Sequence, residues 1–188
     1  SLAADQRELA ELANNASLQL YLWQLVRARQ QPTTDDAQTE SAQQAYLRNL
    51  LLAAAERGGY MPDPATRVPA NLPRSLSYGL ALLDAELRPV VVTPGLGELA
   101  DSYGEVMRGA LAKPGATLVD LRLDAEDRAV VVIAVAVAAV SGSLTGGGPP
   151  NGVLVGVRSA ERELYPLLGR GPAFAEDSET LLVSRDKD

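Results

Sequence analysis

The chain has 188 residues, a length that suits one packed domain, and its 46% of hydrophobic residues excludes a disordered chain. A net charge of −7 and a pI near 4.7 argue against binding nucleic acid through its phosphates, because that needs a basic surface. The chain has no histidine and no cysteine, which excludes disulfides, Ser-His and Cys-His nucleophile pairs, and the commonest zinc ligands. We therefore expect no catalytic residue, no metal and no cofactor.

Residues 3–30 are predicted to form one long helix with two apolar stripes. The first stripe follows the three–four spacing of one helix face and consists of Leu9, Leu12, Ala16, Leu20 and Trp23. The second consists of Leu18, Leu22 and Leu25. A surface helix needs only one apolar stripe, so the second favours packing on a partner helix, and a single broad core face is the alternative. We accordingly expect a homodimer, or a monomer–dimer equilibrium, through residues 3–30.

A second helix is predicted over residues 37–57. Thr34, Asp35 and Asp36 are good helix starters, and Gly58 tolerates the left-handed conformation that often ends a helix. Residues 1–58 are thus expected to be an N-terminal helical region. The following segment, 60–74, contains four prolines and is expected to be an irregular connector.

Two ten-residue stretches nearly repeat one another, LDAELRPVVV from Leu83 and LDAEDRAVVV from Leu123. Each is typical of a strand end, a polar turn and the start of a second strand. Asp84 and Asp124 suit such turns, because a short carboxylate can accept hydrogen bonds from backbone N–H groups just ahead of it. The repeat predicts two hairpins, with strands over 77–84 and 88–93 and over 117–123 and 128–140.

The remaining elements complete an α+β domain. Residues 96–112 are predicted to form a short helix between the hairpins, and a Gly/Pro-rich loop over 141–151 leads to a last strand over 152–159. A short helix is predicted over 160–169. Two helices, two strands, a helix, three strands and a helix give a five-stranded antiparallel sheet with helices around it.

This order resembles the Cache family of extracellular PAS-like sensor domains. The matching phrases are GLALLDAELRPVVVTPG (79–95), TLVDLRLDAEDRAVVVIAVAV (117–137) and NGVLVGVRSAERELYPLL (151–168). The resemblance implies a PAS-like five-stranded antiparallel sheet with long N-terminal helices, and a sensor module over 59–170. The tail, SETLLVSRDKD (178–188), resembles the opening strand of another such module. Residues 171–188 are therefore expected to be a linker into a second module, as in the membrane-distal half of a double-Cache receptor.

The resemblance also implies a setting. The chain would be a fragment of a bacterial inner-membrane receptor, on its periplasmic or extracellular side. The output of such a receptor would be a histidine kinase, a diguanylate cyclase or phosphodiesterase, or a chemotaxis protein. A rival hypothesis is a cytoplasmic PAS-like dimerisation or adaptor module that binds no small molecule.

In Cache-like domains the ligand pocket lies over one face of the sheet, under the helix between the second and third strands. By position, this resemblance implies a ligand-binding set of Tyr78, Tyr103, Arg108, Asp120 and Arg122. An arginine can clamp a carboxylate through two hydrogen bonds, and an aspartate can hold an ammonium group. The expected ligand is a small organic acid or an amino-acid-like molecule. For each of the five residues, a packing or surface role is the alternative.

Overall fold

The computed structural model describes residues 2–31, 37–61, 78–96, 99, 101–124, 128–140 and 148–160. Three helices come first, α1 (Leu2–Ala13), α2 (Ala16–Gln30) and α3 (Ala37–Arg57). They are followed by β1 (Gly79–Asp84) and β2 (Pro89–Val92). A single 3₁₀ turn, η1 (Asp101–Tyr103), leads into α4 (Gly104–Ala112). The chain continues with β3 (Thr117–Leu123), β4 (Ala129–Val137) and β5 (Gly152–Ser159).

The five strands form one antiparallel sheet in the order β2-β1-β5-β4-β3. The last strand along the chain, β5, therefore lies in the middle, where Leu154 pairs with Leu82 of β1 and with Val135 of β4. This arrangement confirms the predicted α+β class and the five-stranded antiparallel sheet.

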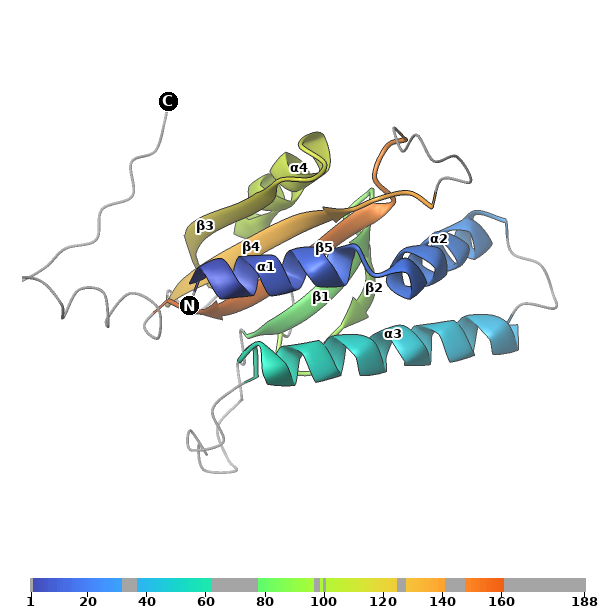
Figure 1. The fold of residues 1–188 in the computed structure, drawn as a ribbon, viewed down its shortest axis with the longest axis horizontal. Coiled ribbons are helices and arrows are strands. Elements are labelled where there is room, and N and C mark those ends of the chain that lie inside the picture. The colour runs from blue at the N-terminus through green and yellow to red at the C-terminus, as the bar shows by residue number, and fades with distance from the viewer. Residues whose placement is uncertain are drawn as a thin grey trace, which may run out of the picture.

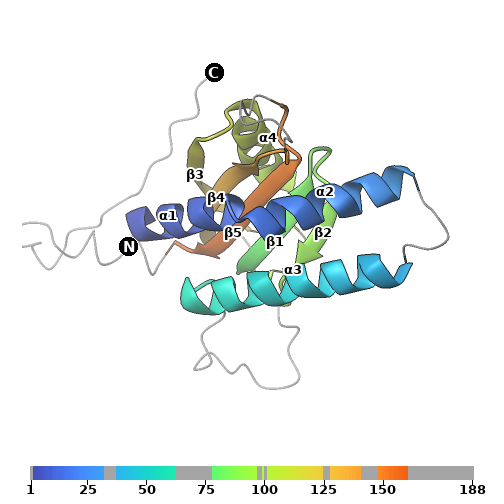
Figure 2. The same ribbon diagram turned by 45° about the vertical axis from the view of Figure 1, so that its right-hand side comes forward.

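Helices cover both faces of the sheet (Figures 1 and 2). Because side chains alternate along a strand, Leu80 and Leu82 of β1 join the core under α1, α2 and α3, whereas Ala81 and Leu83 join the core under α4. The strands β4 and β5 divide their side chains in the same way, and nearly every residue in them is buried. A strand buried on both faces is a continuous apolar run, which explains AVVVIAVAV in β4.

The prediction of a single helix over 3–30 is wrong. The helix stops at Ala13 and restarts at Ala16, because the Asn15 side chain caps α2 by accepting a hydrogen bond from the Leu18 backbone N–H at 3.0 Å. The break lets Leu9 of α1 and Leu22 of α2 pack into one core.

The second apolar stripe is therefore not free for a partner. Leu18 and Leu22 are fully buried within the chain, and Leu25 is nearly so. In the first stripe Leu9 and Leu12 are buried, whereas Ala16 and Leu20 are exposed and Trp23 is half-buried. The assignment of Leu18 and Leu22 to an intermolecular face is thus wrong, and the homodimer itself stays a prediction.

Both predicted hairpins form, and the residues that flank their two turns make similar contacts; residues 125–127 of the second turn lie outside the described residues. Asp84 accepts hydrogen bonds from the backbone N–H groups of Glu86 and Arg88, and Asp124 accepts one from the backbone N–H of Arg128. In each turn the guanidinium Nε of the arginine four residues ahead donates to the same carboxylate at 2.9 Å. The hydrogen bond that the Arg88 guanidinium donates to Asp84 also raises the pKa of Arg88 above its ordinary value. The first turn follows Asp84, which pairs with Gly152 at the start of β5. The second turn follows Leu123, which pairs with Ala129, and the next residue, Val130, pairs with Ser159 at the end of β5. The two turns therefore lie at opposite ends of the antiparallel sheet.

Several predicted boundaries shift. Within the helix predicted over 96–112, the structure has a 3₁₀ turn from Asp101 and an α-helix from Gly104, while residues 97, 98 and 100 lie outside the described residues. The strand predicted over 128–140 ends at Val137. The helices and strands over 37–57, 117–123 and 152–159 have the predicted bounds. Three predicted segments lie wholly or mostly outside the described residues: 62–74 of the connector predicted over 60–74, 161–169 of the helix predicted over 160–169, and 171–188. Residues 141–147 of the predicted Gly/Pro-rich loop also lie outside them.

Candidate functional site

The predicted ligand-binding residues all belong to the α4 side of the sheet or its edge. Tyr103 closes η1 and is buried against the sheet. Tyr78, just before β1, is half-buried against the same core. Arg108 is exposed on α4, and Asp120 and Arg122 are half-buried on β3.

Three charged side chains of this region do meet. The Arg122 guanidinium contacts the Asp120 carboxylate at 2.7 Å and the Glu105 carboxylate at 2.8 Å, so it joins β3 to α4. Its Nε atom is buried and makes no hydrogen bond with any described residue. Glu105 is the member that sequence reasoning missed, because no spacing along the chain relates a helix residue to a strand seventeen positions away.

None of the other three candidates makes a contact with this cluster that the structure shows, and Tyr103 is buried in the core under α4. The Arg128 guanidinium carbon lies over the Tyr78 ring, 5.9 Å from the centroid of that ring, beside the second turn. Arg108 lies along its own helix, since a Cβ built on Gly104 would be 3.4 Å from its guanidinium nitrogens. The structure thus brings Asp120 and Arg122 together and does not gather all five.

The space between α4 and the sheet is packed with side chains. Val106, Met107 and Ala110 are buried there, against a strand surface of alanine and valine that includes Val132 and Val155. A small molecule could enter this layer only if α4 moved. The proposed pocket in this layer stays a prediction.

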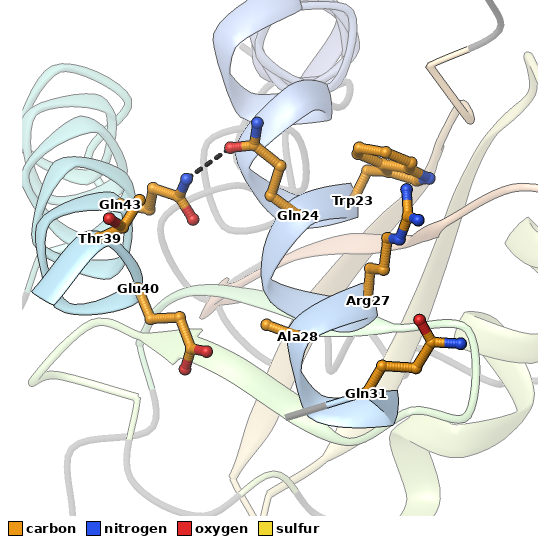
Figure 3. Close-up of a pocket in the computed structure, with 8 residues that line it drawn as sticks. All are labelled: Trp23, Gln24, Arg27, Ala28, Gln31, Thr39, Glu40 and Gln43. Atoms are coloured by element: carbon orange, nitrogen blue, oxygen red, sulfur yellow. Dashed lines mark hydrogen bonds between the residues drawn. The ribbon is translucent and has the colours of Figure 1, made fainter. Parts of the chain in front are cut away.

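A hollow of about 340 Å³ lies elsewhere, between the C-terminal half of α2 and the N-terminal half of α3. We call it the α2–α3 cleft, and its walls are Trp23, Gln24, Arg27, Ala28, Gln31, Thr39, Glu40 and Gln43. Figure 3 shows Gln24 and Ala28 on the side of α2 that faces α3, whereas Trp23 and Arg27 point away from α3. The hollow therefore continues from the gap between the helices onto the neighbouring surface of α2. The Gln43 amide donates a hydrogen bond to the Gln24 carbonyl across the cleft.

A second hollow of about 360 Å³ shares three of these walls and adds Val26, Gln30 and Asn151. Asn151 stands just before β5, where its backbone N–H donates to the Val137 carbonyl. Its side-chain Nδ2 is buried and has no hydrogen-bond partner among the described residues. Sequence reasoning missed both hollows, because it considered residues 3–30 only as two apolar stripes, one for the core and one for a partner helix.

A buried ion pair ties α1 to the central strand. The Arg158 guanidinium of β5 contacts the Asp5 carboxylate of α1, and both side chains are 10% exposed. The same guanidinium lies 5.7 Å from the Tyr60 ring centroid. Burying two charges is favourable only when they are closely paired, so this contact fixes where α1 lies on the sheet.

None of the helices in the described ranges is long and apolar enough to cross a membrane. Within the same ranges, no three acidic side chains lie close enough to hold a metal ion.

No family model and no curated protein matches the chain. Among solved structures, it is similar to the ligand-binding domain of the Pseudomonas fluorescens chemoreceptor CtaA, whose structure was determined in complex with L-serine. That similarity has a TM-score of 0.37 and 20% sequence identity, and covers 68% of this chain and 57% of the chemoreceptor domain. A Mycobacterium tuberculosis transcriptional regulator is similar with a TM-score of 0.34 and 13% identity, over 92% of this chain and 69% of the regulator. These similarities are weak and concern the fold alone.

Proposed function

We propose that this chain is a non-enzymatic, extracytoplasmic ligand-sensing domain of a bacterial membrane receptor. The observation that carries the proposal is the position of β5, which contacts a helix on each face of the sheet. Val157 packs in the core under α4, and its neighbour Arg158 holds Asp5 of α1 on the opposite face. One strand therefore connects the α4 side, where we place the ligand, with the N-terminal helix, which would lead toward the membrane.

In this proposal the ligand acts by population shift. A small organic acid or an amino-acid-like molecule would compete with Glu105 for the Arg122 guanidinium and so loosen α4 from β3. A change in how α4 packs on β5 would then alter the docking of α1. A ligand changes this equilibrium only as far as it prefers one packing over the other.

A thermal-shift screen against organic acids and amino acids tests the proposal. A ligand that binds only the native protein raises its melting temperature, and at a concentration a hundred times its Kd contributes about 2.7 kcal/mol. We expect the shift to be lost in Arg122→Ala and reduced in Arg108→Ala. Arg48→Ala, an exposed arginine of α3, is the matched control and should keep the full shift. A ligand that shifts Arg122→Ala and the wild type equally would contradict this site.

The adaptor hypothesis has one observation in its favour, the packed layer of side chains between α4 and the sheet. An adaptor would use this sheet as a rigid support and bind only protein. The parent gene separates the two hypotheses. A hydrophobic membrane-spanning segment encoded just before residue 1 supports the receptor, and its absence supports the adaptor.

A further inference from the structure

The α2–α3 cleft is outside the α4 side of the sheet and is not used by the proposed sensing mechanism. Its two ionic side chains, Arg27 on α2 and Glu40 on α3, carry opposite charges. The lining therefore has no net charge, and it favours neither an anion nor a cation. This distinguishes the cleft from the Arg122 region, where a guanidinium is the natural partner of a carboxylate ligand.

The remaining polar groups of the cleft are mostly carboxamides. Gln24, Gln31 and Gln43 line it, and each amide offers one acceptor oxygen and two donor hydrogens. The bond between Gln43 and Gln24 uses only part of this capacity. In the adjoining hollow, the buried Nδ2 of Asn151 is a donor with no partner among the described residues. Such a lining matches a molecule that presents several neutral groups, each both donor and acceptor.

An aromatic ring completes the lining. Trp23 borders both hollows, and the Arg27 guanidinium lies 5.2 Å from its ring centroid, which holds the two side chains together. An indole gives a flat apolar surface with one polar N–H, so it suits a ligand with an apolar face and a polar edge. A sugar ring has this form, with C–H groups on its faces and hydroxyl groups around its rim.

We propose that the α2–α3 cleft and the adjoining hollow bind a neutral, polyhydroxylated ligand, of the class of mono- and disaccharides. The volumes of about 340 and 360 Å³ lie within the range usual for small-molecule sites. The carboxamides would bond the hydroxyl groups, and Trp23 would contact the C–H face. The proposal holds whether or not the α4 side senses a ligand.

The experiment uses Trp23, because it is the only tryptophan of the chain and its fluorescence reports on this site alone. Glucose, mannose, galactose, maltose and cellobiose are titrated into the wild-type protein while tryptophan emission is recorded, and calorimetry gives Kd independently. We expect at least one sugar to change the emission saturably. The variants Gln31→Ala and Gln43→Ala should each weaken its binding by about tenfold, the loss of one or two hydrogen bonds.

Gln38→Ala is the matched control, because Gln38 is an exposed glutamine of α3 that does not line the cleft. It should leave Kd within about twofold of the wild type. Citrate and serine serve as charged probes and should leave the emission unchanged. The proposal is overturned if no sugar of the panel changes the emission or binds by calorimetry, or if Gln38→Ala weakens binding as much as Gln43→Ala. The thermal-shift test with Arg122→Ala is scored separately, so either proposal can fail without the other.

Discussion

At the scale of single residues, two glycines of β5 decide how closely the N-terminal helices approach the sheet. A Cβ on Gly156 would lie 2.6 Å from Cε1 of Tyr60 and 3.1 Å from a methyl carbon of Leu9. A Cβ on Gly152 would lie 3.0 Å from a methyl carbon of Leu22 in α2 and 2.1 Å from the Leu83 carbonyl oxygen in β1. Any side chain at these positions would therefore push neighbouring groups out of the core.

We predict that Gly156→Ala lowers the free energy of unfolding by about 2 kcal/mol, because overpacking forces buried side chains from their positions. Gly148→Ala is the control, since a Cβ there would be 3.7 Å from its nearest neighbour, an ordinary contact. It should change stability by less than about 0.5 kcal/mol. Urea denaturation followed by circular dichroism measures both. Equal stability of the two variants would show that the close packing at Gly156 is not energetically important.

At the scale of elements, α1 is a separate unit, held to β5 and joined to α2 through a break. The break lies at Asn14 and Asn15, where the Asn15 side chain caps α2. Across the break, the Gln19 side chain of α2 donates one hydrogen bond to the Ala13 carbonyl of α1 at 3.1 Å. On the other side, α1 is held by apolar contacts from Leu9 and Leu12 and by the pair between Asp5 and Arg158. The helix can therefore detach while α2 keeps its own cap and core contacts.

We predict that Asp5→Asn speeds amide hydrogen exchange in residues 2–13 while α2 and the sheet keep their protection. The substitution removes the negative charge that faces the buried Arg158 guanidinium, and losing one partner of a buried pair costs about 3–5 kcal/mol if the protein stays closed. Opening α1 relieves that cost by exposing the guanidinium to water. Hydrogen exchange with mass spectrometry measures the effect, with Glu11→Gln, an exposed acid of α1, as the control. A uniform rise in exchange over the whole chain would mean that α1 is not a separate unit.

At the scale of the whole molecule, the predicted homodimer must use a different surface from the one first assigned. With Leu18 and Leu22 in the core, the large apolar side chains exposed on α2 and α3 are Leu20 at 37% and Tyr46 at 42%. The rings of Tyr46 on α3 and Tyr21 on α2 meet edge to face, with 5.1 Å between their centroids. Tyr46 therefore belongs to the surface shared by α2 and α3. An association through this surface would leave the core of each copy intact.

We predict that Leu20→Glu abolishes self-association and keeps the fold, because it places a charge on an exposed position of the interface. Leu18→Glu should instead unfold the protein, since it buries an unpaired carboxylate in the core. Sedimentation velocity over a range of concentrations measures association, and circular dichroism measures folding. A wild-type protein that stays monomeric at its highest soluble concentration would contradict the dimer.

The elements with local signals could be predicted from the amino-acid sequence. The alternation in β3, the unbroken apolar runs of β4 and β5, and the aspartates that close both hairpins are set by residues near one another in the chain. The fold class followed from their order. The break at Asn15 was also a local signal, but the continuous apolar spacing across residues 9–25 obscured it.

The side-chain contacts between distant elements became known only from the folded structure. The pairing of Asp5 with Arg158 joins residues 153 positions apart, and the clusters of Arg122 with Glu105 and of Trp23 with Asn151 likewise span several elements. The sheet order places β5 in the centre although it comes last in the chain, and no periodicity encodes that choice. These contacts depend on how whole faces pack to exclude water, which is a property of the assembled core and not of any short segment.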